Sequence, residues 1–450
     1  MIGIIMFFVG MSMLLLGFPV AFTFGAISVV FGLVAGIVES LGDGGGLMEG
    51  LQIGAHLFAF MPHRIWSIME NAILISVPMF ILMGIILQKS RLAERLLEAM
   101  GFLFGEVRGG VAISTVLVGA LLAASTGVVG ASVVAMGVIS LPVMLKYNYS
   151  KSLACGTICA SGTLGQIIPP SVVLIILGDV FQQPVGDLFA GALGPGLTLV
   201  GVYVAYIAVT AFFNKEAAPA IPRHEIKESK RRQILSAFKA ILPPLILIVL
   251  VLGSIFEGIA TPTESSAVGC IGAMVLAWMY RSFSFKMVQE ASLETVRATA
   301  MVFAILIGAT AFSMVFSYTG GDEIVEAAMR SLPGDKWGFI VVSMLAIMAL
   351  GFFIDFVEIS YIIVPILAPI AAAIGLNPVW YALLIALNLQ TSFLTPPFGF
   401  SLFFLRGVAP SCVTTMDIYK GVVPFIVLQI CVMILFTLWP ELYGIDIMLK

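Results

Sequence analysis

Two acidic residues, Asp355 and Glu358, lie deep inside a long apolar stretch of this sequence. A carboxylate is costly in an apolar environment, so acids at such positions are usually functional. Three roles compete for Asp355: a sodium ligand, a proton carrier, and an acceptor for backbone amides at the tip of a hairpin. The residues leave all three open. Asp355 lies nearer the expected break in the stretch than Glu358 and is the stronger candidate, with Ser360 following in the same segment.

Two proline pairs, Pro169-Pro170 and Pro396-Pro397, interrupt other apolar stretches. Adjacent prolines remove two amide donors and free carbonyl groups about one turn back. Within a bilayer such carbonyls are tolerated where they line a cavity or meet a partner. Carbonyl and hydroxyl oxygens suit Na⁺, and the amino termini of half-helices suit a carboxylate. The predicted contacts with ion or substrate are Gly162, Thr163, Pro169, Pro170 and Ser171 at the first break, and Thr391, Ser392, Thr395, Pro396 and Pro397 at the second.

A third polar interruption adds Ser125, Thr126, Gly127 and Ser132 to the predicted contacts. Sodium is the one metal expected, near Thr163, Asp355 and Thr395, with no other cofactor. The three histidines are scattered outside the apolar cores, and the five cysteines have no metal-ligand spacing. An intramembrane protease needs paired acids on facing helices. Because both acids here share one segment, we expect no enzyme and no catalytic residue.

The elements that must position these residues are membrane helices. The chain is 60% hydrophobic and 10% charged, against roughly 25% charged residues in soluble domains. Two apolar stretches, residues 110–145 and 338–374, are too short for two crossings with a loop and are interrupted near the middle. We interpret both as re-entrant hairpins. The ten predicted crossings are residues 2–16, 19–38, 72–87, 152–178, 188–213, 241–256, 265–280, 296–318, 381–405 and 418–439.

The distribution of Lys and Arg predicts the orientation. The linker at residues 214–239 carries seven cations, which indicates the cytoplasmic side. Counting crossings from this linker puts the other basic loops inside and both termini outside. Changing either hairpin into a single crossing would invert the loops beyond it, so the agreement also supports the hairpins.

An internal repeat divides the chain. Pro142 and Pro369 are 227 residues apart (369 − 142), as are Pro169 and Pro396 (396 − 169). The predicted divisions are a first repeat at residues 1–213 with a broken helix at 152–178, the linker, and a second repeat at 240–450 with a broken helix at 381–405. Five crossings in each half place the halves in opposite orientations. An all-α polytopic fold with inverted repeats, two hairpins and two broken helices is the architecture of secondary transporters.

The segment from Gly156 to Ser171 closely resembles a signature of the DctM family, the large membrane subunit of tripartite ATP-independent periplasmic (TRAP) transporters. Residues 260–267 and 395–399 are similar to further patterns of the family. The resemblance covers essentially the whole chain. It implies an elevator-type transporter in the bacterial inner membrane, in which Na⁺ drives the import of a small organic acid. It also implies two partners, a small four-helix membrane subunit and a periplasmic substrate-binding protein. At Glu358 the sequence departs from the usual family pattern.

Two alternatives remain at this point. A stand-alone sodium- or proton-coupled symporter of divalent anions would share the hairpins and inverted repeats but need no capture protein. Such carriers have a Ser-Asn-Thr motif at each site, which the breaks here lack. The intramembrane enzyme is the more distant alternative. The residues name neither the organic acid, the number of Na⁺ ions, nor the oligomeric state.

Overall fold

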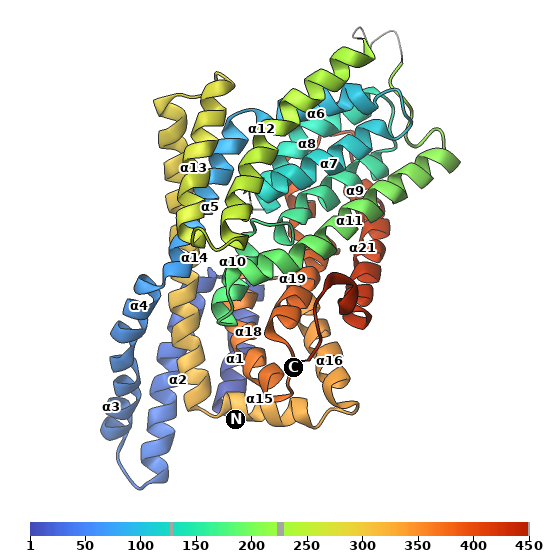
Figure 1. The fold of residues 1–450 in the computed structure, drawn as a ribbon. Helices are drawn as coiled ribbons and strands as arrows, with labels where there is room; N and C mark the ends of the chain where they lie inside the picture. Colours follow the sequence, from blue (N-terminus) through green and yellow to red (C-terminus); the bar gives the residue numbers. More distant parts are fainter. Residues whose placement is uncertain (127–128, 223–228, 449–450) are drawn as a thin grey trace.

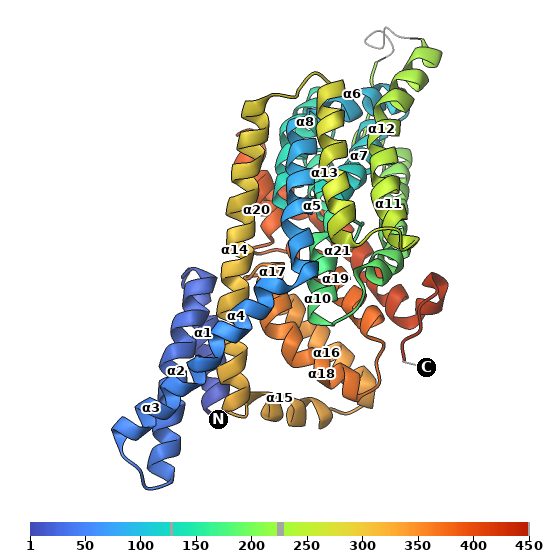
Figure 2. The same cartoon turned by 60° about the vertical axis from the view of Figure 1, so that its left-hand side comes forward.

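The computed structural model describes residues 1–126, 129–222 and 229–448. Apolar runs of bilayer length satisfy their backbone groups internally as helices. The described residues accordingly form α-helices with short 3₁₀ and π-helical turns, apart from one isolated bridge between Leu376 and Met448. The helices form two packed groups, which we call the frame bundle and the hairpin bundle (Figures 1 and 2).

The frame bundle is built from the uninterrupted helices that precede the hairpin in each half. The helices α1, α2 and α5 of the first half correspond to α12, α13 and α14 of the second. Corresponding pairs make the same contacts: α2 packs on α14 and α13 on α5, while α1 packs on α2 and α12 on α13. These matched pairs reflect the internal repeat. Its members are α1 (Ile2–Leu15), α2 (Val20–Gly42), α5 (Ala72–Lys89), α12 (Lys230–Phe256), α13 (Pro262–Met279) and α14 (Phe285–Tyr318).

The hairpin bundle contains the interrupted elements and the last helix of each half. The first half contributes α7 (Gly110–Thr126), α8 (Val129–Lys146), α9 (Lys151–Thr163), the 3₁₀ turn η2 (Leu164–Gln166), α10 (Val172–Val180) and α11 (Val185–Phe213). The second contributes α16 (Asp335–Leu350), α17 (Phe356–Glu358), the π-helical turn η3 (Ile359–Ile363), α18 (Val364–Ala373), α19 (Pro378–Leu394), α20 (Phe400–Val408) and α21 (Thr415–Leu438). The 3₁₀ turn η4 (Pro440–Tyr443) follows.

Two helices that the sequence analysis did not predict connect the bundles. They are α6 (Leu92–Phe104), which contacts α12 and α7, and α15 (Gly321–Arg330), which contacts α14 and α16. Figure 1 places α6 at the upper end of the molecule and α15 at the lower end with the amino terminus. Each of these helices precedes the hairpin of its half, so the two hairpins enter from opposite ends. The predicted inverted fold class is thus confirmed.

A second segment absent from the prediction runs between α2 and α5. It comprises α3 (Leu47–Leu57), the 3₁₀ turn η1 (Phe58–Phe60) and α4 (Met61–Glu70). A Cβ atom on Gly36 would overlap the backbone of Gly50 and Gly54, so α2 and α3 approach each other more closely than side chains would permit. The glycines explain why a segment of modest hydrophobicity packs as a helical extension.

Eight helices within the described residues are long and apolar enough to cross a membrane, whereas ten crossings were predicted. The broken helices fall below that length because each crosses as two pieces. Residues 2–15 form a short helix, and the polar first turn of α13 lowers its mean hydropathy. Six of the eight, α2, α5, α11, α12, α14 and α21, are predicted crossings. The other two, α8 and the stretch Phe356–Ala373, are arms of the predicted hairpins.

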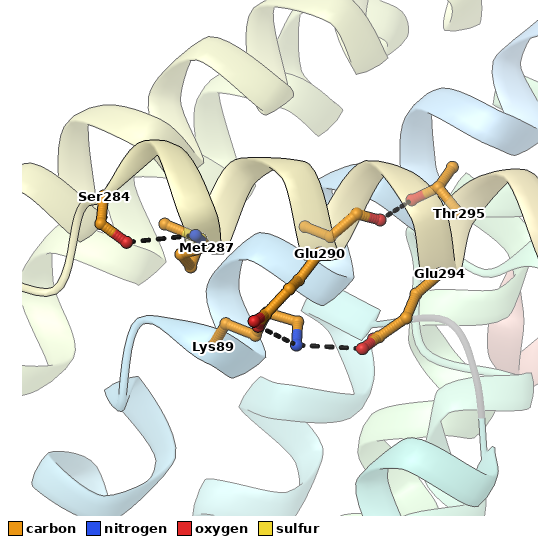
Figure 3. Close-up of polar contacts among 7 residues, drawn as sticks. Lys89, Ser284, Met287, Glu290, Glu294 and Thr295 are labelled. Atoms are coloured by element: carbon orange, nitrogen blue, oxygen red, sulfur yellow. Dashed lines mark hydrogen bonds and ion pairs between the residues drawn. The ribbon is translucent and has the colours of Figure 1, made fainter.

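The first turns of α14 show why helices extend beyond the predicted crossings. The sequence predicted a crossing from residue 296, but α14 begins at Phe285 because the Ser284 hydroxyl accepts a hydrogen bond from the Met287 amide at 3.1 Å (Figure 3). Lys89 at the end of α5 lies between Glu290 and Glu294 of α14, with N–O distances of 3.4 and 3.0 Å. These half-exposed ion pairs join the two helices where they leave the apolar region.

Candidate ion and substrate site

The first helix break separates α9 from α10 and is buried throughout. The Ser171 hydroxyl donates to the freed carbonyl of Gln166 at 2.7 Å, and the Thr163 hydroxyl donates to the Ala160 carbonyl at 2.9 Å. Each hydroxyl uses its proton on the backbone and keeps lone pairs for a cation. The peptide bond between Pro169 and Pro170 is cis, as is that between Pro396 and Pro397.

The second break separates α19 from α20 and has the same type of ligands. The hydroxyls of Thr391, Ser392 and Thr395 donate to carbonyls three or four residues earlier, at 2.8, 2.8 and 2.7 Å. Thr395 and Pro396 are half-buried and Pro397 is exposed, so this break reaches the surface of the protein. Both breaks therefore present neutral oxygen atoms of the type that suits Na⁺.

Asp355 and Glu358 form a reciprocal cap at the tip of the second hairpin. Asp355 Oδ1 accepts from the Phe356 amide at 2.7 Å, and the Glu358 carboxylate accepts from the Asp355 amide. This is a capping box, and it satisfies amide donors that would otherwise be unpaired. The backbone-acceptor role expected among the three alternatives is therefore present in the geometry. Ser360 is buried in the π-helical turn η3, and its hydroxyl has no hydrogen-bond partner among the described residues.

The first hairpin is described in part. Gly127 lies outside the described residues, as do the side chains of Ser125 and Thr126. Ser132 is buried on α8. A Cβ atom on Gly162 would collide with Val133, so the first break packs directly against this hairpin next to Ser132.

The predicted residues form two half-sites, one in each repeat. In the second half-site a Cβ atom on Gly351 would collide with Ser392, and the rings of Phe356 and Phe393 lie 6.2 Å apart. Asp355 and Thr395 belong to this half-site, whereas Thr163 belongs to the first. The half-sites meet where α19 contacts α9 and η2. The tip of the second hairpin, α17 and η3, also contacts α10 beyond the first break. The predicted sodium positions therefore come from both half-sites. Among the described residues no group of three or more His, Cys, Asp or Glu could hold a metal ion.

Sequence reasoning missed a set of buried amides where the two half-sites meet, on η2, α19 and α21. Gln429 Nε2 lies 3.5 Å from Thr163 Oγ1, and the Tyr203 hydroxyl lies close to Gln429 and Gln390 beyond ordinary hydrogen-bond geometry. Both polar atoms of the Gln166 and Gln390 side chains lack a partner among the described residues. Single glutamines in apolar helices have no periodic pattern. The signal that could have found them is energetic: burying an amide side chain in an apolar helix is costly, so a glutamine there usually has a role.

The comparisons with known proteins agree with this geometry. The family model "Tripartite ATP-independent periplasmic transporter, DctM component" matches residues 4–442. A C4-dicarboxylate TRAP transporter large permease protein of Pseudomonas aeruginosa is 30% identical over 381 residues, 84% of this chain and 86% of that protein. The ectoine TRAP transporter large permease protein of Halomonas elongata is 29% identical, with 96% and 95% covered. The crystal structure of the Alcanivorax borkumensis YdaH transporter has a similar fold, with a TM-score of 0.58, 14% identity, and 87% and 89% covered.

Proposed function

The chain belongs to the DctM component family of tripartite ATP-independent periplasmic transporters, and we propose that it is the large permease subunit of a sodium-driven importer of a small organic acid. The family and the similar proteins are transporter permeases, so the chain is a membrane transport protein and not an enzyme. The proposed location is the bacterial inner membrane with both termini in the periplasm.

The observation that carries this proposal is the pair of helix breaks, each packed against the hairpin of its own repeat. The Ser171 hydroxyl lies beside the Gln166 carbonyl, which Pro170 leaves without an amide donor, and the Thr163 and Thr395 hydroxyls bond carbonyls three or four residues earlier, where the helices end at the breaks. The long helices provide the surrounding membrane spans. Neutral oxygens that replace the water shell of a small cation can bind Na⁺ without an acid at the break.

The proposed substrate is an anion because α10 and α20 begin at the breaks. The amino terminus of a helix carries unsatisfied amide donors and a partial positive charge, which favours a carboxylate. Val172 begins α10 and Phe400 begins α20. Bound Na⁺ would add positive charge at the same place, which couples the binding of the two.

The proposed partners are a small four-helix membrane subunit and a periplasmic protein that captures the substrate. Two similar permeases are named for different substrates, C4-dicarboxylates and ectoine. Family membership therefore leaves the individual substrate open, and a separate capture protein is a simple way to select it.

Reconstitution in liposomes tests this function. The chain is reconstituted with its small membrane subunit, and uptake is measured with each candidate capture protein and with imposed Na⁺ or H⁺ gradients. We expect uptake that needs an inward Na⁺ gradient and a capture protein. Full uptake in Na⁺-free buffer under a proton gradient would overturn the assignment of the ion, and uptake without any capture protein would favour a stand-alone symporter.

The orientation has a separate test. In a background without the native cysteines, we expect Lys215→Cys in the basic linker to resist an impermeant thiol reagent when the outer membrane alone is permeabilised. Ser331→Cys, in the connection between α15 and α16 at the opposite end, should react. Both residues are exposed, so access depends on the side of the membrane. The reverse pattern would invert the whole topology.

A further inference from the structure

Asp179 is a buried carboxylate that the proposed sites do not use. It lies near the end of α10 in the hairpin bundle and is 8% exposed. Its Oδ1 accepts a hydrogen bond from Asn71 Nδ2 at 2.5 Å. Asn71 precedes α5 of the frame bundle, so this bond joins the two bundles across their boundary. A buried acid in a membrane protein is expensive, and its place calls for an explanation.

Asn71 uses both ends of its side-chain amide. Its Oδ1 caps α5 by accepting from the Ile73 amide at 3.0 Å, while its Nδ2 holds Asp179. Because the cap fixes Asn71, the donor is presented to α10 in one defined direction.

A third element meets at the same place. Tyr361, in the π-helical turn η3 of the second hairpin, is buried, and it interacts electrostatically with Asp179. Its hydroxyl has no hydrogen-bond partner among the described residues. The helix α10, which carries Asp179, contacts both η3 and α5. The carboxylate thus lies where a frame helix, a broken helix and a hairpin converge.

We propose that Asn71 and Asp179 form a polar latch that holds the hairpin bundle in the position seen here, making Asp179 a positioning residue for transport. This inference rests on the proposed function, since an elevator moves one bundle past the other and must break every side-chain bond between them. The latch stabilises one end of that movement. Releasing it changes the balance between the two positions and the turnover rate, while the ligands at the helix breaks remain intact.

The opposite end of α5 provides an independent reporter. Gln88 Nε2 lies 3.5 Å from the Ala131 carbonyl on α8. Cysteines at these two positions, in a background without the five native cysteines, can be joined by a short bifunctional thiol reagent while the bundles keep this arrangement. Movement of the hairpin bundle along α5 separates them. The extent of cross-linking therefore measures the population of the latched position without substrate or Na⁺.

The decisive variants exchange the two side chains. Asn71→Asp keeps an oxygen to cap α5 but sets a carboxylate against Asp179, so we expect cross-linking to fall severalfold. Adding Asp179→Asn restores the pair with the roles exchanged: the asparagine at position 179 donates and the aspartate at position 71 accepts. We expect cross-linking to recover to at least half of the parent value. A purely structural role for the Asn71 cap predicts no loss in the first variant. Unchanged cross-linking in Asn71→Asp, or failure of the exchange to restore it, would overturn the latch.

If Asn71→Asp gives no folded protein, Asp179→Ala is the second test. It removes the acceptor without adding a charge, and we expect lower cross-linking with a changed maximal uptake rate and an unchanged Na⁺ requirement. Parent-like cross-linking in this variant would reject the proposal. The outcomes also separate the two hypotheses: absent Na⁺-driven uptake in the parent, together with the expected cross-linking pattern, rejects the proposed function but supports the latch.

Discussion

The two helix breaks are equivalent in the repeat but differ in their surroundings. Residues 161–171 are buried throughout, whereas Pro397 and Phe398 are exposed at the second break. The first break lies beside Gln429 and Tyr203, with neutral polar atoms; the second lies beside the hairpin that carries Asp355 and Glu358. Both breaks thus carry hydroxyl and carbonyl oxygens, but they differ in exposure and in the charge of their neighbours.

This difference suggests a division of labour. A closed, neutral half-site suits an ion that stays bound through most of the cycle, because its exchange needs movement of the surrounding helices. An open half-site with a carboxylate nearby suits an ion that exchanges readily and whose binding responds to charge. The predictions below compare matched variants of the two half-sites, from the largest expected effect to the smallest.

Packing between each break and its hairpin should be the most sensitive feature. Gly162→Ala places a methyl group against Val133, and Gly351→Ala places one against Ser392. Overpacking of this kind costs about 1–3 kcal/mol, so we expect initial uptake per folded transporter to fall roughly tenfold or more in each. The matched control is Gly201→Ala on α11, where an added Cβ meets no atom within 4 Å. Parent-like uptake in either test variant would show that the hairpin does not need its tight contact there.

Asp355→Asn should affect the second half-site without unfolding it. Asparagine is as good a helix cap as aspartate, so the acceptor for the Phe356 amide is retained while the charge is lost. We expect a roughly tenfold higher Na⁺ concentration at half-maximal uptake, equivalent to about 1.4 kcal/mol.

Glu358→Gln is the control for the same hairpin. It keeps an acceptor for the Asp355 amide and should change the Na⁺ requirement less. An unchanged Na⁺ dependence with normal uptake in Asp355→Asn would leave Asp355 with the capping role alone.

The hydroxyls compare the half-sites directly. Thr163→Val and Thr395→Val replace a hydroxyl by a methyl group of similar size, and both threonines already donate to backbone carbonyls. Loss of one neutral ligand oxygen should raise the Na⁺ requirement by about three- to tenfold, corresponding to about 0.7–1.4 kcal/mol. Because weaker binding appears mainly as faster dissociation, we expect Thr163→Val to speed Na⁺ release from the closed half-site, where release is slow in the parent. Release from the open half-site is already fast, so Thr395→Val should change the Na⁺ requirement alone. Equal effects on affinity and kinetics in the two would contradict the division of labour.

Much of this arrangement could be predicted from the sequence because it depends on local chemistry. The pairs Pro169-Pro170 and Pro396-Pro397 each interrupt a helix, whereas Pro243-Pro244 lies inside the continuous helix α12, so the repeat at 227 residues was the more specific signal. Apolar runs of fixed length define spans and hairpins. The helix α3 was missed because its packing depends on the contact between Gly36 and Gly54, which are 18 residues apart (54 − 36).

The bonds between distant elements could not be predicted for a related reason. Asn71 and Asp179 are separated by 108 residues, and Gln429 and Thr163 by 266. Each of these residues is unremarkable in its own segment. Their partners become clear once the helices are placed against one another in space. The periodicity of a single sequence does not give that placement. The division of the sodium candidates into two half-sites has the same origin.

Substitution of Gln429 should have the smallest effect, and it tests whether this side chain belongs to the closed half-site. Its Nε2 makes a long contact of 3.5 Å with Thr163 Oγ1, while its Oε1 is buried without a partner among the described residues. Gln429→Met has a similar shape and removes both atoms, so a weak bond is lost together with an unsatisfied acceptor. These terms are each about 1 kcal/mol and opposite in sign, so thermal stability should stay within about 1 kcal/mol of the parent and the Na⁺ requirement within roughly threefold. Na⁺-dependent thermal stabilisation of the purified variant measures both. A tenfold weaker response to Na⁺, with the response of Gly201→Ala unchanged, would instead place Gln429 among the ion ligands. The closed half-site would then be built by α9, α10 and α21.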